Sequence, residues 1–208
     1  MWHAIVNGNS NLIAFLAKHK APIDTDSSGN RTYPIAIALK TARSYAERLA
    51  GTTFEPAVIP FKLKAANYYY PVIKNLIMVG CSPDEAPAED DRPIFTAIRN
   101  KYDHIFRILV ESGAADRDFS VQVNVAQGYH RIMITVKTIR EYCGAHDYDE
   151  GIKIIDEYWK NAAKKKTLVF TMHKNKNYYF SLLNRDIVGI VCDYIKPPKL
   201  VTSNETQQ

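Results

Sequence analysis

Residues 92–118, RPIFTAIRNKYDHIFRILVESGAADRD, contain two short apolar runs that are separated by KYDH and end at a Ser-Gly-Ala corner. Pro93 suits the first turn of a helix, because its missing amide hydrogen costs nothing there. Gly113 suits the left-handed backbone conformation that ends a helix. The stretch therefore predicts two helices in succession, whose apolar residues pack on neighbouring elements.

The same pattern occurs in two segments upstream. Aligning the corners Lys20, Gly80 and Gly113 places the apolar residues of the three segments in common columns. One column holds Leu12, Val72 and Ile105, the next holds Ile13, Ile73 and Phe106, and the third holds Leu16, Leu76 and Leu109. The distance from Ala38 to Gly80 indicates that the second copy carries an insertion of about 26 residues, at about 41–66.

The period and the starts of these copies resemble the ankyrin repeat, which has roughly 33 residues, two antiparallel helices, a turn and a T-P-L-H-x-A start. The corresponding starts here are YPIAIA at 33–38 and RPIFTA at 92–97. The threonine and histidine of the family are absent from both, so we expect irregular geometry. The resemblance implies an all-α solenoid of about three to four repeats, with clear repeats over residues 1–118 and a helical C-terminal extension.

Residues 119–180 predict either a degenerate repeat or a helical pair that packs on the last clear repeat. FSVQVNVAQGYHRIMITV is a candidate start for a fourth unit, although Ile132, Ile134 and Val136 alternate as in a strand. TVKTIREYCG and DYDEGIKIIDEYWKNAAKK then predict two amphipathic helices. TLVFTM, HKNKN and YYFSLL, at 167–183, are interpreted as a short hairpin or as a turn that leads into the final helix.

Residues 181–198 predict a final helix, which has two interpretations. It caps the open end of the solenoid, or it resembles the first helix of an F-box and implies binding to the Skp adaptor of a cullin-RING ubiquitin ligase. The F-box spacing is carried by Leu183, Asp186, Ile187, Val188, Val191, Tyr194 and Ile195, and Asn184 stands where the family has proline. The polar tail, 199–208, is expected to be disordered.

The composition is that of an ordinary soluble protein, with 46% hydrophobic and 24% charged residues. There is no apolar run of the roughly 18 residues that a membrane helix needs, and no signal-peptide pattern at the start. The three cysteines form no even or closely spaced set, which favours a reducing compartment. We therefore expect a cytoplasmic protein, or one in the host cytoplasm if it is a secreted effector.

The sequence contains no arrangement of residues that calls for chemistry. The six histidines show no metal-ligand spacing, and the glycines form no phosphate-binding loop. We expect no catalytic residues, no cofactor and no metal. The net charge of +5 hints weakly at an acidic partner, but no element that reads nucleic acid is visible. An enzyme hypothesis would require a deep polar pocket in the insertion or in the last quarter of the chain.

Protein binding is the function that the ankyrin resemblance implies, through a monomeric scaffold with a concave surface formed by first helices and turn fingers. Carried over by position, this surface consists of His3, Asn7, Ile37, Lys40, Thr96, Arg99 and Asn100, with finger tips near 26–31 and 85–91. Tyr69, in the triplet 68–70, is included as an interface anchor, with core packing as the alternative. The second hypothesis is an effector-type adaptor that holds a target on the repeats and recruits the ligase through its last helix.

Overall fold

The computed structural model describes residues 1–23, 31–51, 59–127 and 130–174. The chain divides into two units, 1–154 and 155–208, which are considered separately. The first unit is mostly helical, as predicted, and also holds a two-stranded sheet. No helix among the described residues is long and apolar enough to cross a membrane.

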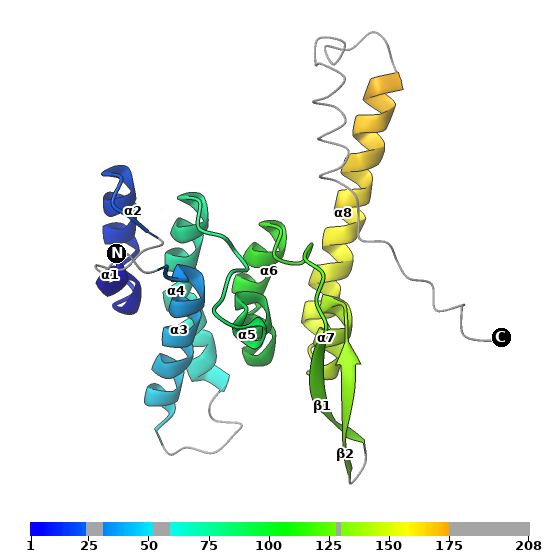
Figure 1. The fold of residues 1–208 in the computed structure, drawn as a ribbon, viewed down its shortest axis with the longest axis horizontal. Helices are drawn as coiled ribbons and strands as arrows, with labels where there is room; N and C mark the ends of the chain where they lie inside the picture. Colours follow the sequence, from blue (N-terminus) through cyan, green and yellow to red (C-terminus); the bar gives the residue numbers. More distant parts are fainter. Residues whose placement is uncertain (24–30, 52–58, 128–129, 175–208) are drawn as a thin grey trace, which may run out of the picture. The chain divides into compact units, whose positions relative to one another are not determined.

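Three helix pairs follow one another along the first unit. They are α1 (Trp2–Val6) with α2 (Ser10–Lys18), α3 (Pro34–Ala50) with α4 (Ile59–Met78), and α5 (Pro93–Asn100) with α6 (Asp103–Glu111). Helices α1, α3 and α5 pack in succession as one row, and α2, α4 and α6 pack as a second row (Figure 1). The core between the rows contains Ile13, Ile73, Phe106 and Leu109, which are fully buried. Two of the aligned residues are exceptions, because Leu12 is 39% exposed and Leu16 is half-buried.

The second helix of each pair ends in the same way. Lys20, Gly80 and Gly113 have φ values of 56°, 93° and 90°. The amide of the residue that follows each corner donates to the carbonyl of the aligned leucine, Leu16, Leu76 or Leu109, and each of these bonds is 3.0 Å long. The predicted equivalence of the three corners is therefore confirmed at the level of backbone hydrogen bonds.

The predicted insertion mainly lengthens the second pair. Residues 41–50 continue α3 and residues 59–66 begin α4. Farther along α4, the Tyr68 hydroxyl donates to the carbonyl of Asn7 at 3.1 Å. A Cβ atom on Gly8 would lie 2.2 Å from the Tyr68 ring, so only glycine allows this close approach.

Residues 121–127 and 130–136 are two paired strands of a β-hairpin, so the interpretation of this stretch as the start of a helical unit is wrong. Strand β1 (Val121–Gln127) pairs antiparallel with β2 (His130–Val136), in a register that sets Val121 opposite Val136. β-branched residues alternate with polar ones in β1, and side chains in a strand point alternately to opposite faces. The alternation therefore produces a sheet with one aliphatic face instead of a helix.

Helix α7 (Ile139–Ala145) follows the hairpin and packs on α5 and β1. Thr138 and Glu141 form a capping box at its start. Helix α8 (Asp149–Lys174) begins in the first unit and continues into the second. Residues 167–174 are therefore helical instead of a hairpin or a turn, and the rest of that predicted stretch, 175–183, lies outside the described residues. The predicted helical pair is confirmed, and the Tyr148 hydroxyl at the start of α8 donates to Asp103 Oδ1 of α6 at 2.7 Å.

The end of α7 repeats the geometry of α1 and α5. Gly8, Lys101 and Asp147 all have positive φ. The next amide in each case donates to the carbonyl of Ala4, Ala97 or Cys143, at 2.8, 3.0 and 3.0 Å. Cys143 therefore stands where α1 and α5 have their small alanine, and α7 ends as a first helix does.

Candidate protein-binding surface

The predicted contact residues lie on the row formed by α1, α3 and α5. His3, Asn7, Lys40 and Arg99 are exposed, whereas Ile37, Thr96 and Asn100 are half-buried. They occupy matching positions when the alanines at 4, 38 and 97 are aligned, and the three helices pack in succession. The structure therefore brings these seven residues together along one row of helices, which we call the first-helix surface.

Arg99 is held by other parts of the protein. Its guanidinium donates to the Tyr142 hydroxyl of α7 at 3.1 Å and to the carbonyl of Asp90 at 2.7 Å. Asp90 lies in the short 3-10 helix η1 (Glu89–Asp91) that precedes α5. Burial raises the pKa of Tyr142 above its ordinary value, although Arg99 acts against this rise. Arg99 thus fastens α5 to the preceding segment and to α7.

Asn100 and Tyr69 also make internal hydrogen bonds. The Asn100 side chain donates to the carbonyl of Thr96 at 2.8 Å. Tyr69 is only 2% exposed and donates to the carbonyl of Val6 at 2.7 Å, so the structure places it in the interior rather than at an interface. Tyr68 is the exposed member of the triplet at 48%, and its ring stacks on Tyr45 at 5.6 Å. The core-packing alternative therefore describes Tyr69, and Tyr68 is the exposed aromatic side chain of the triplet.

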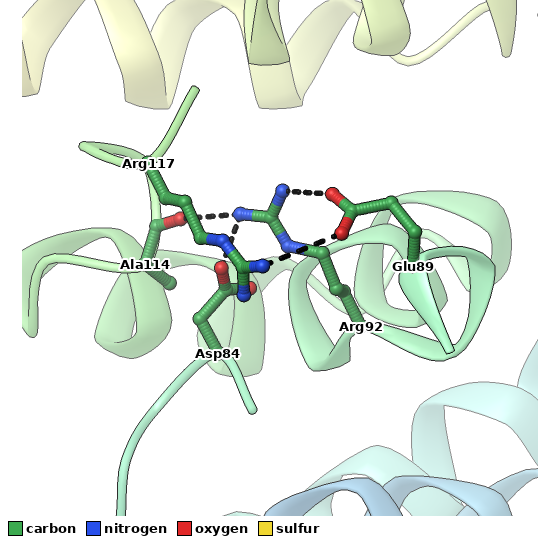
Figure 2. Close-up of polar contacts among 5 residues, drawn as sticks. All are labelled: Asp84, Glu89, Arg92, Ala114 and Arg117. Atoms are coloured by element: carbon green, nitrogen blue, oxygen red, sulfur yellow. Dashed lines mark hydrogen bonds and ion pairs between the residues drawn. The ribbon is translucent and has the colours of Figure 1, made fainter. Parts of the chain in front are cut away.

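A buried charged cluster fixes the segment before α5, and the sequence analysis did not identify it. Arg92, 1% exposed, donates to Asp84, to Glu89 at 2.6 Å and to the Ala114 carbonyl at 3.4 Å (Figure 2). Its guanidinium lies over the ring of Phe95 at 4.9 Å and over the ring of Phe119 at 5.4 Å. Arg92 occupies the first position of the repeat start, where the ankyrin pattern has threonine.

The cluster balances its own charges. Arg117 approaches Glu89 at 3.6 Å, so two carboxylates face two guanidinium groups. Burial raises the pKa of Asp84 above its ordinary value and outweighs the lowering by Arg92. For Arg92 burial alone would lower the pKa, but hydrogen bonds to Asp84 and Glu89 raise it. The guanidinium stays charged and ties residues 84–91 to α5 and to the start of the next segment. The only sequence signal was an arginine placed before Pro93 with acidic residues upstream.

Two clefts lie where the first and second helix pairs meet. One has a volume of about 380 Å³ and is lined by Ala14, Ala17, Lys18, Ile23, Asn75, Met78 and Val79. The other has a volume of about 450 Å³, and Arg31 and Glu85 form an exposed ion pair of 2.5 Å at its wall. Neither cleft is lined by residues of the insertion or of the last quarter of the chain, where the enzyme hypothesis places its pocket.

Within the described residues, no group of three His, Cys, Asp or Glu side chains is arranged to hold a metal ion. Burial raises the pKa of the Cys143 thiol to about 12, so it is protonated at neutral pH and is a poor nucleophile.

The residues of the F-box-like helix, 183–195, lie outside the described part of the chain. Comparisons with protein-family models, with curated proteins and with solved structures give no match to this chain.

Proposed function

We propose that this chain is a divergent ankyrin-type repeat protein that carries out no catalysis and binds a partner protein on its first-helix surface. The observation that carries the proposal is the hydrogen-bonded corner that recurs at Lys20, Gly80 and Gly113. Together with the two rows of helices, it supports a repeating unit of two helices and a turn. Repeats of this kind present a wide, continuous surface, which suits protein binding.

The charges along this surface favour an acidic partner. Lys40 is exposed and forms no ion pair within the described residues, and Arg99 lies on the neighbouring helix of the same row. Arg99 is fixed in place by the carbonyl of Asp90 and the hydroxyl of Tyr142, so its orientation is set before a partner arrives. A positioned side chain loses less conformational entropy on binding than a mobile one.

The test compares two double variants that each add negative charge, in affinity capture from a cell extract followed by mass spectrometry. His3→Asp with Lys40→Glu alters the first-helix surface. Asn11→Asp with Lys74→Glu makes the same two changes in charge at exposed positions of the other row. We expect the first variant to lose the captured partner by about tenfold or more and the second to retain it.

Thermal unfolding must show that both variants remain folded. If the wild type and both variants recover the same proteins in equal amounts, the first-helix surface is not the binding site and the proposal fails.

A further inference from the structure

The hairpin offers a strand edge that the helix pairs do not have. In the part of the chain that the structure describes, the sheet contains only β1 and β2. The outer edge of β2 therefore carries backbone amide and carbonyl groups without a partner strand, and such an edge can accept another strand by backbone hydrogen bonding.

The two faces of the hairpin differ in chemistry. The register places the pairs Val121 with Val136, Val123 with Ile134, and Val125 with Ile132 on one face. Exposure on this aliphatic face increases from the base to the tip, from 2% at Val136 to 39% at Ile132. The protein covers the base of the face and leaves its outer part open.

The opposite face of β2 is basic. Arg131, Met133 and Thr135 alternate along the strand and are exposed, and Lys137 continues the alternation just beyond it. Met133 is 62% exposed. The sequence from 119 to 140 contains no aspartate or glutamate, so no acidic residue of the hairpin itself neutralises these cations.

We propose that the outer edge of β2 binds an extended segment of a partner protein in which acidic residues alternate with aliphatic ones. Added as a third strand, such a segment places its aliphatic side chains beside Ile132 and Ile134. Its acidic side chains then lie on the other face, beside Arg131 and Lys137. Cross-strand neighbours of opposite charge and of matching apolar type stabilise a sheet, so both faces favour this chemistry.

Two other occupants fit less well. A nucleic acid would contact the side chains of Arg131 and Lys137 through its phosphates but would leave the aliphatic side chains of Ile132 and Ile134 without an apolar partner. A second copy paired through β2 would bring two sets of Arg131 and Lys137 onto one sheet face, where like charges repel. An acidic strand meets neither obstacle.

This inference does not rest on the first-helix surface, because it concerns the backbone edge and side chains of β2. The hairpin variant is Arg131→Glu with Lys137→Gln, which avoids a new negative charge beside Glu141, whose carboxylate accepts from the Lys137 amide. The control is Lys64→Glu with Lys74→Gln at exposed positions of α4, with the same change in net charge.

The experiment selects peptides of roughly twelve residues, enough to span one strand, from a random displayed library with the full-length protein as bait. We expect enriched peptides to alternate acidic and aliphatic residues. A synthetic peptide of the enriched sequence should bind the hairpin variant at least about tenfold more weakly than the wild type and the control. Circular dichroism confirms that both variants are folded.

The proposal is overturned if the enriched peptides lack this alternation, or if the hairpin variant binds the synthetic peptide as well as the control does. It is also overturned if a single-stranded DNA oligonucleotide binds β2 in preference to the peptide. Self-association in sedimentation that the hairpin variant abolishes would likewise assign the edge to a second copy. The variant His3→Asp with Lys40→Glu should leave peptide binding intact, so the two proposals fail separately.

Discussion

Residues 79–91, between α4 and α5, and residues 112–137, between α6 and α7, occupy the same place in successive helix pairs but are held by different forces. In both segments the second residue is a glycine with positive φ, and the backbone hydrogen bonds around it are the same. The first segment is then fixed by the buried charges around Arg92. The second segment contains the hairpin, and the base of the hairpin is held by buried aliphatic residues such as Val121 and Val136.

The difference shows that the same backbone conformation at the end of a helix can be followed by two kinds of anchor: a cluster of buried charges, or a set of buried aliphatic residues. Charged groups need partners at defined positions, so the Arg92 cluster fixes one arrangement at the cost of desolvation. Aliphatic residues need only burial, and the outer aliphatic residues of the hairpin, Val125 and Ile132, remain partly exposed. The charged anchor also stabilises both segments, because Arg92 contacts the Ala114 carbonyl and the Phe119 ring at the start of the second segment.

Removing the charged anchor should have the largest effect. Arg92→Met leaves Asp84 buried without its partner, and breaking a buried ion pair in this way typically costs about 3 to 5 kcal/mol. Urea unfolding followed by circular dichroism measures the loss. The double variant Arg92→Met with Asp84→Leu should recover much of it, because no uncompensated charge remains. A loss below about 1 kcal/mol for the single variant would show that the cluster is not an anchor.

Trimming the aliphatic anchor should cost less. Val136→Ala removes two buried methyl groups at the base of the hairpin and should lower the free energy of unfolding by about 1.5 kcal/mol. Val125→Ala makes the same change on the half-buried outer part and serves as the matched control. Equal losses in urea unfolding would contradict the contrast between a covered base and an open tip.

Substitution of the glycine at the start of each segment should lower stability by the same amount in both segments. Gly80→Ala and Gly113→Ala each place a Cβ atom at a positive φ, which costs about 1 kcal/mol. No heavy atom lies within 4 Å of the new Cβ at Gly80, and the nearest at Gly113 is Asp116 Oδ2 at 3.6 Å. The two thermal midpoints should therefore fall by similar amounts. A much larger drop at one site would mean that the corners differ in more than backbone conformation.

The helix pairs were predictable because their signals are local. Pro93 at a helix start, Gly80 and Gly113 at helix ends, and apolar residues at helical spacing each act within a few residues. The hairpin carried an equally local signal in the alternation of VQVNVAQ and RIMITV, but the repeat interpretation assigned this stretch to a helical unit. In the structure, the local alternation of apolar and polar residues determined the secondary structure of this stretch, and the period of the upstream repeats did not.

The first-helix surface was predictable by position but not by side-chain contact. Alignment of the copies placed His3, Lys40 and Arg99 on one row of helices, as the structure shows. It did not reveal that Arg99 reaches Tyr142, because that contact joins residues 43 positions apart. The burial of Arg92 was also hidden, since nothing local marks an arginine as internal when its partners are brought by the fold.

The smallest expected effect concerns pH and compares α5 with α7. His146 at the end of α7 stands where α5 has Asn100, and its ring lies 4.6 Å from that of Tyr142. Burial and the nearby charges of Arg99 and Lys101 lower the pKa of His146 below its ordinary value, and Asp147 opposes them in part. The unfolded chain therefore takes up a proton more readily, so stability is retained above about pH 6.5 and lost as the pH falls below it.

His146→Asn should flatten the decline in thermal midpoint between about pH 7 and pH 5. His104→Asn alters an exposed histidine of α6, and an equal flattening by that variant would show that burial of His146 is not the cause.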